Sequence, residues 1–179
     1  GGFIGANEGT LNVQRSTAYL RQAAKDGARL VVLPELCDSG YGFLDQEEVR
    51  AVAETATESK ALKSWGQVAS EFGVYVVAGF CERDGEDFFN SAAVIGPDGL
   101  VGVYRKTHLF YKENLFFRPG NVGIPVFELP FANVGVLICY DIRFPEAVRH
   151  LAARGVDILC VPTNWVMAVG KKCDDRGYT

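Results

Sequence analysis

The spacing of apolar residues along the chain predicts helices that alternate with strands. One helix is expected from the capping residue Asn12 to Gly27 and a second over residues 61–72, because both carry apolar residues three and four positions apart. A third helix is expected from Pro145, a residue suited to the first helical position, to Arg154. Short apolar runs predict strands at residues 29–34, 74–80, 88–95, 100–106, 126–130, 134–139 and 157–162.

The segments between these elements contain turn signals. Asp84 and Gly85 predict a hairpin and GPDG at 96–99 predicts a turn, so residues 74–106 are expected to form consecutive antiparallel strands. Residues 107–124 show no clean period and are expected to be a long loop, and no element is expected from Thr163 onward. Such a meander among alternating helices and strands favours a layered α/β domain.

Composition and charge narrow the class of protein. A length of 179 residues fits one domain over 1–179, and 48% hydrophobic with 22% charged residues are globular values. The net charge of −4 indicates no basic surface, so neither nucleic acid nor an anionic membrane is an expected partner. No apolar run approaches the roughly 18 residues of a membrane span, and the first residues do not resemble a signal peptide.

The cysteines, at positions 37, 81, 139, 160 and 173, are odd in number and form no Cys-x-x-Cys pair. This pattern fits reduced thiols in a cytoplasmic protein, and it offers neither a zinc knuckle nor a redox motif. No glycine-rich phosphate-binding motif occurs in the sequence, so nucleotide binding has no motif support.

Two candidate catalytic residues follow predicted apolar strands. Cys139 is followed by a turn and a helix, and the positive end of that helix would lower the thiol pKa and favour the thiolate. A small buried apolar cysteine is the alternative interpretation. Glu35 comes just past a wholly apolar strand, at a sheet edge where α/β proteins place their sites, although a solvated loop glutamate would give the same pattern.

Two further charged residues are candidates in the segment that follows. Lys106 ends the strand 100–106, where a fixed ammonium can stabilise a developing oxyanion, and an ordinary surface lysine is the alternative. Glu113 lies among aromatic residues and is either a desolvated acid or a solvated loop carboxylate.

The only histidines of the chain are His108 and His150. A Cys–His dyad would need one of them beside Cys139, and because His150 lies far along the predicted helix, His108 is the open candidate. A zinc site made of Glu35, His108 and Cys139 is conceivable, but no ligand pair has metal spacing, so no metal is expected.

Three segments, LVVLPELCDSGY, YRKTHLF and VGVLICYDIRFPE, occur in this order. Together they resemble the three signature blocks of the nitrilase superfamily, the carbon–nitrogen hydrolases. The segments NSAAVIGPDG, FRPGN and VPTNW agree with the resemblance, which covers about residues 12–165.

The resemblance implies an αββα sandwich whose subunits pair into dimers or larger homo-oligomers, without a metal or an organic cofactor. It implies a Glu–Lys–Cys triad that corresponds here to Glu35, Lys106 and Cys139, with Glu113 matching a second glutamate of the active site. The implied reaction is thiol attack on a small linear amide, release of ammonia and hydrolysis of the thioester. In this reaction Lys106 and the N–H of Tyr140 would hold the oxyanion.

The block CYDIRFPE resembles the branches that act on small ω-amides and related carboxylate-bearing amides, and N-carbamoyl amides are the alternative substrates. Arg143 is expected to pair either with a substrate carboxylate or with a nearby carboxylate such as Glu146. Tyr41, Phe116 and Trp165 are candidate pocket walls, although aromatic core packing would account for each of them.

Members of this superfamily have a strand ahead of the position of residue 12 and continue well past VPTNW, so the chain is expected to be incomplete at both ends. That expectation leaves a non-catalytic scaffold module as a second hypothesis. A Cys–His hydrolase that uses His108 is the third.

Overall fold

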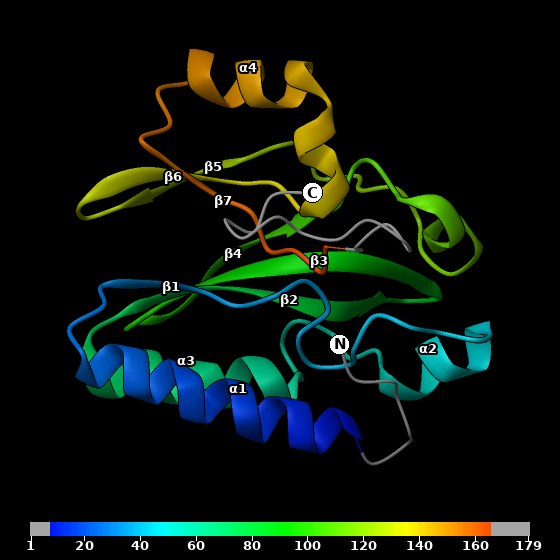
Figure 1. Cartoon of the computed structure of the whole chain (residues 1–179), viewed down its shortest axis with the longest axis horizontal. Coiled ribbons are helices and arrows are strands. Elements are labelled where there is room, and N and C mark those ends of the chain that lie inside the picture. The colour runs from blue at the N-terminus through cyan, green and yellow to red at the C-terminus, as the bar shows by residue number, and fades with distance from the viewer. Residues whose placement is uncertain (1–7, 166–179) are drawn as a thin grey trace, which may run out of the picture.

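A computed structural model describes residues 8–165 as two β-sheets that lie face to face between layers of helices. Helices α1 (Glu8–Lys25) and α3 (Lys60–Phe72) cover the outer face of one sheet, and α4 (Pro145–Ala153) covers the outer face of the other (Figure 1). These layers are the αββα sandwich that the family resemblance implied. Among residues 8–165, no helix combines the length and hydropathy needed to cross a bilayer.

The first sheet has the strand order β1–β2–β3–β4. Its strands are β1 (Leu30–Val32), β2 (Tyr75–Asp84), β3 (Asp87–Gly96) and β4 (Gly99–Arg105). Strand β1 runs parallel to β2, and β2, β3 and β4 form an antiparallel meander with a hairpin at Gly85. This meander confirms the turn signals at 84–85 and 96–99.

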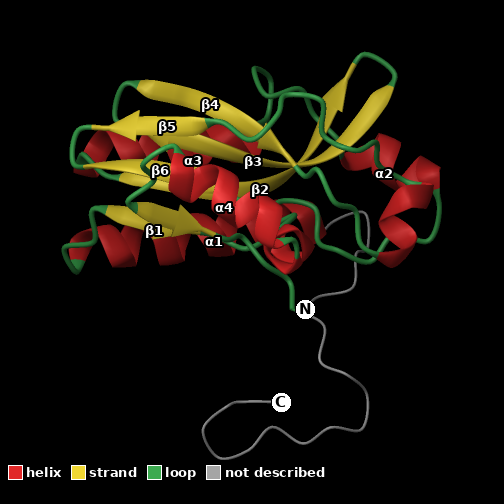
Figure 2. Ribbon diagram, turned by 90° about the horizontal axis from the view of Figure 1, so that it is seen from above, coloured by secondary structure: helices red, strands yellow, loops and turns green. Residues whose placement is uncertain are grey.

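The second sheet has the order β5–β6–β7. Its strands are β5 (Val126–Leu129), β6 (Ala132–Val136) and β7 (Ile158–Cys160), with β5 antiparallel and β7 parallel to β6. The connection from β6 to β7 passes through α4, as expected for parallel neighbours. A further helix, α2 (Gln46–Val52), lies at one end of the sandwich, apart from the helices that cover the sheets (Figure 2).

The alternation of side chains along β2 divides its residues between two cores. Val76, Ala78 and Phe80 pack against the buried Trp65 of α3. Val77 points the other way and belongs to the core between the two sheets. Strand β2 is apolar on both faces because each face is covered by another layer of the fold.

Several boundaries differ from the predicted ones. Helix α1 begins at Glu8, one turn before Asn12, and β6 ends at Val136 rather than at 139. The expected loop 107–124 contains a short 3-10 helix, η1 (Tyr111–Leu115), which is too short to show a period. Helix α2 was missed, although Asp45 caps it by accepting from the N–H of Glu48. Thr163–Trp165 form no element, and the remainder of the tail, with Cys173, lies outside the described residues.

Gly79 of β2 allows the segment after β1 to lie directly against the sheet. A Cβ atom at this position would be 2.5 Å from the Pro34 carbonyl oxygen and 2.6 Å from the Glu35 Cα. The Gly79 N–H donates to the Pro34 carbonyl, and the Cys37 N–H donates to the Gly79 carbonyl. The backbone at Glu35 can therefore lie this close to β2 only because Gly79 has no side chain.

We expect Gly79→Ala to lower the free energy of unfolding by about 1–3 kcal/mol, the usual cost of overpacking. Gly66→Ala, in the middle of α3, is the matched control, because its Cβ would meet only Ile95, at 3.8 Å. The control should be stabilising by up to about 1 kcal/mol, since alanine favours a helix interior. Urea unfolding of both variants measures the difference, and equal effects of the two would contradict the argument from close approach.

Candidate active site

Three charged side chains and one thiol, from four different segments, meet in the loops that follow the strands. Glu35 lies just after β1, Lys106 directly after β4, and Cys139 begins the 3-10 turn η2 (Cys139–Arg143) that follows β6. Glu113 belongs to η1. The structure thus brings together the four residues that the sequence proposed for catalysis.

Lys106 is the centre of this cluster. Its Nζ lies 2.6 Å from Glu35 Oε1 and 2.9 Å from Glu113 Oε1, and the side chains of Lys106 and Glu35 have no exposed surface. Burial alone would lower the pKa of Lys106, but the negative charges of the two glutamates outweigh burial and raise the pKa. One ammonium group is therefore held in its charged form between two carboxylates.

Glu113 is fixed by donors on both of its oxygens. Tyr41 OH donates to Oε1 at 2.7 Å, and the N–H of Phe110 donates to Oε2 at 2.8 Å. Burial raises the pKa of Glu113, and the Lys106 ammonium opposes this effect. Burial and the negative charge of Glu113 raise the pKa of Tyr41, so the phenol keeps the proton that it donates.

Asn90 of β3 is a site residue that the sequence patterns did not predict. Its side chain is fully buried, and Nδ2 donates to Glu35 Oε1 at 2.8 Å and to Glu113 Oε1 at 3.4 Å. Its backbone carbonyl accepts from the N–H of Lys106. A lone amide in the apolar run FFNSAAVI is the signal that could have identified it.

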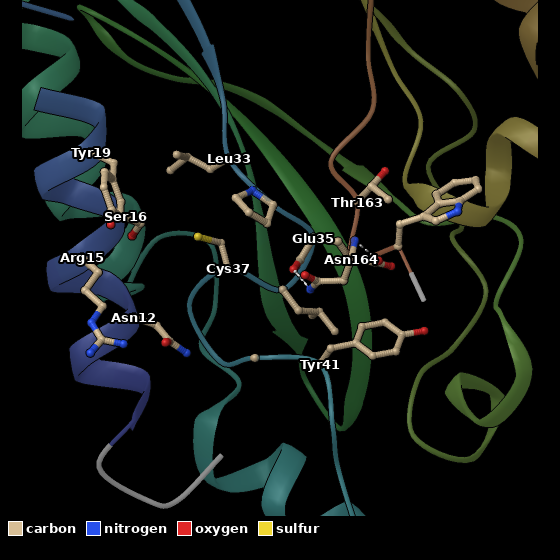
Figure 3. A pocket seen from close by; sticks show the side chains of 14 residues that line it. Asn12, Arg15, Ser16, Tyr19, Leu33, Glu35, Cys37, Tyr41, Thr163 and Asn164 are labelled. Carbon is tan, nitrogen blue, oxygen red and sulfur yellow. Dashed lines mark hydrogen bonds between the residues drawn. The ribbon is translucent and has the colours of Figure 1, made fainter. Parts of the chain in front are cut away.

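Asn164 is the second residue that was missed. Its backbone N–H donates to Glu35 Oε2 at 3.1 Å, and its side-chain amide donates to the Glu35 carbonyl. Figure 3 shows these contacts between Glu35 and Asn164, at the wall of a cavity of about 720 Å³ that extends towards α1. In the same view Cys37, whose pKa burial raises to about 11, faces α1 and lies away from Glu35.

Among residues 8–165, three residues other than glycine have positive φ, and each is a member of the cluster or close to one in the sequence. Cys139 itself has φ 46°, Leu36 next to Glu35 has φ 46°, and Tyr111 in η1 has φ 48°. Such conformations persist only where the surrounding structure enforces them, and they concentrate at functional sites. The N–H of Cys139 is tied to the carbonyl of Pro162 at 3.0 Å, which is one of the contacts that hold the strained turn.

The Cys139 thiol differs from the sequence prediction in its pKa. Burial, followed by the negative charge of Glu35, raises the pKa to about 12, and the Lys106 ammonium offsets only part of this effect. Burial and the charge of Glu35 therefore oppose the thiolate that the sequence favoured, and the turn η2 lies between Cys139 and the start of α4. The thiol therefore needs a base at the moment of attack.

A cavity of about 330 Å³ opens onto Cys139. Its walls come from four segments, which follow β1, β4, β6 and β7, and the lining residues are Tyr41, Phe110, Cys139, Tyr140, Arg143, Asn164 and Trp165. The guanidinium carbon of Arg143 lies 5.0 Å from the centre of the Trp165 ring, and the ion pairs described for residues 8–165 include none between Arg143 and Glu146. Phe116 does not line this cavity and belongs to a neighbouring one of about 230 Å³ beside Glu113.

Neither histidine is among the groups that influence the thiol. His108 Nδ1 lies 2.8 Å from Asp141 Oδ1, and the ring stacks on Phe144 with centroids 3.7 Å apart. His150 is exposed in the last turn of α4. Within residues 8–165, no three His, Cys, Asp or Glu side chains are placed to hold a metal ion. The geometry therefore favours the Glu–Lys–Cys arrangement over the Cys–His and zinc alternatives.

The αββα layers define a hydrolase fold of the nitrilase type. A solved structure of an amidase from Nesterenkonia sp. matches with a TM-score of 0.71 at 27% identity, over 87% of this chain and 59% of that one. The sequence model of the family described as carbon–nitrogen hydrolase matches residues 6–173. The chain belongs to the carbon–nitrogen hydrolase family, as its three sequence blocks indicated.

Two named relatives illustrate the range of this family. A nitrilase of Pyrococcus abyssi is 48% identical over 156 residues, which cover 87% of this chain and 60% of that protein. An omega-amidase of Xenopus tropicalis is 36% identical over 171 residues, which cover 89% of this chain and 60% of that protein. The chain spans about 60% of the length of these relatives.

Asp38 is a buried carboxylate in the same loop as Glu35. Its Oδ1 accepts from the N–H of Ser39 at 2.7 Å and from the N–H of Cys81 at 3.1 Å. Burial raises its pKa to about 6, and these hydrogen bonds offset only part of the cost. Because the folded-state pKa lies above the unfolded one, ionisation of Asp38 lowers stability as the pH rises from about 4 to about 6.

We expect Asp38→Asn to remove this loss, since an amide oxygen can still accept from Ser39 and Cys81. Relative to the unsubstituted protein, the free energy of unfolding of the variant should rise by about 3 kcal/mol across that pH window and stay level above it. Urea unfolding at several pH values measures the difference. A difference that is independent of pH would contradict the raised pKa of Asp38.

Proposed function

We propose that this chain carries the active site of an enzyme that hydrolyses the carbon–nitrogen bond of small linear amides through a Cys139 thioester. The observation that supports the proposal most directly is the buried Lys106 ammonium, held between Glu35 and Glu113 beside the thiol. Buried charge clusters with perturbed pKa values next to a strained nucleophile are typical of catalytic sites. Membership of the carbon–nitrogen hydrolase family supports the same reaction.

In the first half of the reaction, Glu35 accepts the thiol proton while Cys139 Sγ attacks the carbonyl carbon of the amide. The new C–S bond places negative charge on the carbonyl oxygen, which we assign to the Lys106 ammonium and the N–H of Tyr140. Collapse of this intermediate breaks the C–N bond, and Glu35 returns the proton to the leaving nitrogen. Ammonia departs and a thioester remains on Cys139.

In the second half, Glu35 accepts a proton from water, and the resulting hydroxide attacks the thioester carbonyl. The C–S bond breaks, Cys139 recovers its proton through Glu35, and the carboxylic acid leaves. Glu113 takes no proton in this scheme and instead holds Lys106 in place. We assign the base to Glu35 because it is the carboxylate that hydrogen-bonds to the Cys139 thiol, whereas Glu113 acts on the thiol only through its charge. Glu113 itself accepts from Tyr41, Lys106 and Phe110.

For the substrate we propose an amide that carries a carboxylate at its other end. Arg143 lines the cavity over Cys139, with its guanidinium over Trp165. A guanidinium in an aromatic-walled cavity suits a planar carboxylate, and a cavity of about 330 Å³ suits a small molecule. The identity of 36% with an omega-amidase supports this class of substrate.

Two further proposals concern the oligomeric state of the protein and the cellular compartment in which it works. The family resemblance leads us to propose a homodimer or a larger homo-oligomer, which light scattering of the purified protein would test. The described cysteines 37, 81, 139 and 160 are all free thiols, which supports a reducing compartment such as the cytoplasm.

Ammonia release from a panel of amides tests the reaction. The panel contains an ω-amide of a dicarboxylic acid, a simple aliphatic amide, an N-carbamoyl amino acid and a nitrile. We expect release to be fastest from the ω-amide and to fall to the uncatalysed background in Cys139→Ala, because the nucleophile is removed. Mass spectrometry of the quenched protein should show the acyl group on the peptide that contains residue 139.

Cys160→Ala is the matched control, since Cys160 is a buried thiol outside the cluster. It should keep ammonia release within about threefold of the unsubstituted protein. Release that survives Cys139→Ala, or an acyl group on another residue, would overturn the proposed mechanism. Absence of release from every member of the panel would favour the scaffold hypothesis.

The role of Arg143 is tested separately. We expect Arg143→Gln to raise KM for the ω-amide about 10- to 100-fold, because a charged hydrogen bond to the carboxylate is worth about 1.5–3 kcal/mol. Turnover of a neutral aliphatic amide should change little, since it has no carboxylate. Steady-state kinetics with both substrates measure this, and equal losses for the two would exclude carboxylate binding by Arg143.

A further inference from the structure

Asp141 is a fully buried carboxylate that the reaction described above does not use. It lies in the turn η2, and four groups surround its two oxygens within hydrogen-bond distance. Oδ1 accepts from the N–H of His108 at 2.8 Å and lies 2.8 Å from His108 Nδ1. Oδ2 accepts from Tyr104 OH at 2.8 Å and from the N–H of Ile138 at 3.0 Å.

These partners belong to two different parts of the site. Ile138 immediately precedes the nucleophile, in the second sheet's connection to η2. Tyr104 and His108 flank Lys106, one in β4 and the other in the segment after it. Asp141 therefore links the turn that carries the thiol to the segment that carries the ammonium.

The link acts at a strained part of the backbone. Cys139 has φ 46°, a conformation that residues other than glycine adopt only when their surroundings hold it. The hydrogen bond from the N–H of Ile138 to Asp141 closes the turn around Cys139, and the N–H of Asp141 donates back to the carbonyl of Ile138 at 3.0 Å. Loss of the Asp141 carboxylate would remove the first of these two hydrogen bonds and leave only the second to close the turn.

We propose that Asp141 is a positioning residue, whose carboxylate sets the placement of the Cys139 thiol relative to Glu35 and Lys106. The inference rests on the proposed function, because it takes Cys139 as the nucleophile and Glu35 as its base. A carboxylate is suited to this place because it only accepts hydrogen bonds. An amide of the same shape would turn its NH2 group either towards the N–H of His108 or towards the donors of Tyr104 and Ile138.

The test is a double-substitution cycle with Asp141→Asn and Glu35→Gln, read by the alkylation rate of Cys139 with methyl vinyl ketone, an alkylating reagent without an amide bond. Peptide mass spectrometry resolves Cys139 from the other cysteines, and the measurement does not need amide turnover. We expect each single variant to slow alkylation about 100-fold, the typical effect of losing or misplacing an assisting group by about 1 Å. The double variant should be no slower than Glu35→Gln alone, because Asp141 acts through the pairing of thiol and base.

Glu82→Gln is the matched control for loss of a buried carboxylate. Glu82 is 5% exposed and accepts hydrogen bonds from Ser91 and Arg105, without contact to the cysteine turn. We expect it to lower the urea midpoint of unfolding to an extent comparable with Asp141→Asn and to leave Cys139 alkylation within about threefold. Tyr104→Phe removes only one donor from Asp141 and should slow alkylation about tenfold, which keeps the test decisive if Asp141→Asn does not fold.

The outcomes separate this inference from the proposed function. If Glu35→Gln leaves the alkylation rate unchanged, Glu35 is not the base and the proposed mechanism fails. If Glu35→Gln slows alkylation but Asp141→Asn and Tyr104→Phe do not, only the positioning role of Asp141 fails. Fold-changes that multiply in the double variant would show that Asp141 acts independently of the pair, which also overturns the inference. With an amide substrate, the expected split is a lower kcat with KM within about threefold.

Discussion

A lysine ammonium without contact to water is stable in a folded protein only when opposite charge is buried with it. Lys106 meets this condition through Glu35 and Glu113, and the carboxylate oxygens are satisfied in turn by donors such as Asn90 and Asn164. These donors come from β3 and from the segment that follows β7, so the charge cluster connects the two sheets. The loops around the thiol are held in position by the hydrogen bonds and ion pairs that compensate the buried charges of Lys106, Glu35 and Glu113.

The layers of the fold could be predicted from apolar periodicity because nearly every element has a face that must be buried. Pro145 at the start of α4 and Gly73 at the end of α3 marked helix boundaries, because the backbone preferences of proline and glycine act without help from the rest of the fold. Short elements were harder to predict. Helix α2 and the 3-10 helix η1 are held by Asp45 and Glu113, whose side chains accept from nearby N–H groups, and neither has the length to show a period.

The sequence predicted those residues of the candidate site whose chemistry follows from their residue type alone. Glu35, Lys106 and Cys139 stand out as charged or nucleophilic residues at the ends of predicted strands, Glu113 stands out as a charge among aromatic residues, and the structure brings the four together. The pKa of the thiol was not predictable, because it depends on burial and on charges distant along the chain. The role of a buried asparagine is equally hidden in the sequence, since its partners appear only after the sheets have packed.

The hydrogen bonds of the cluster join residues that are far apart in the chain. Glu35 and Lys106 are separated by 71 positions, and Glu35 and Asn164 by 129. Contacts of such long range close late in folding, because the entropy of large loops must be lost before they form. During synthesis and early folding, Cys139 is therefore an ordinary thiol without its base or its ammonium. The pairing of the thiol with Glu35 and Lys106 arises only when the two sheets have packed together.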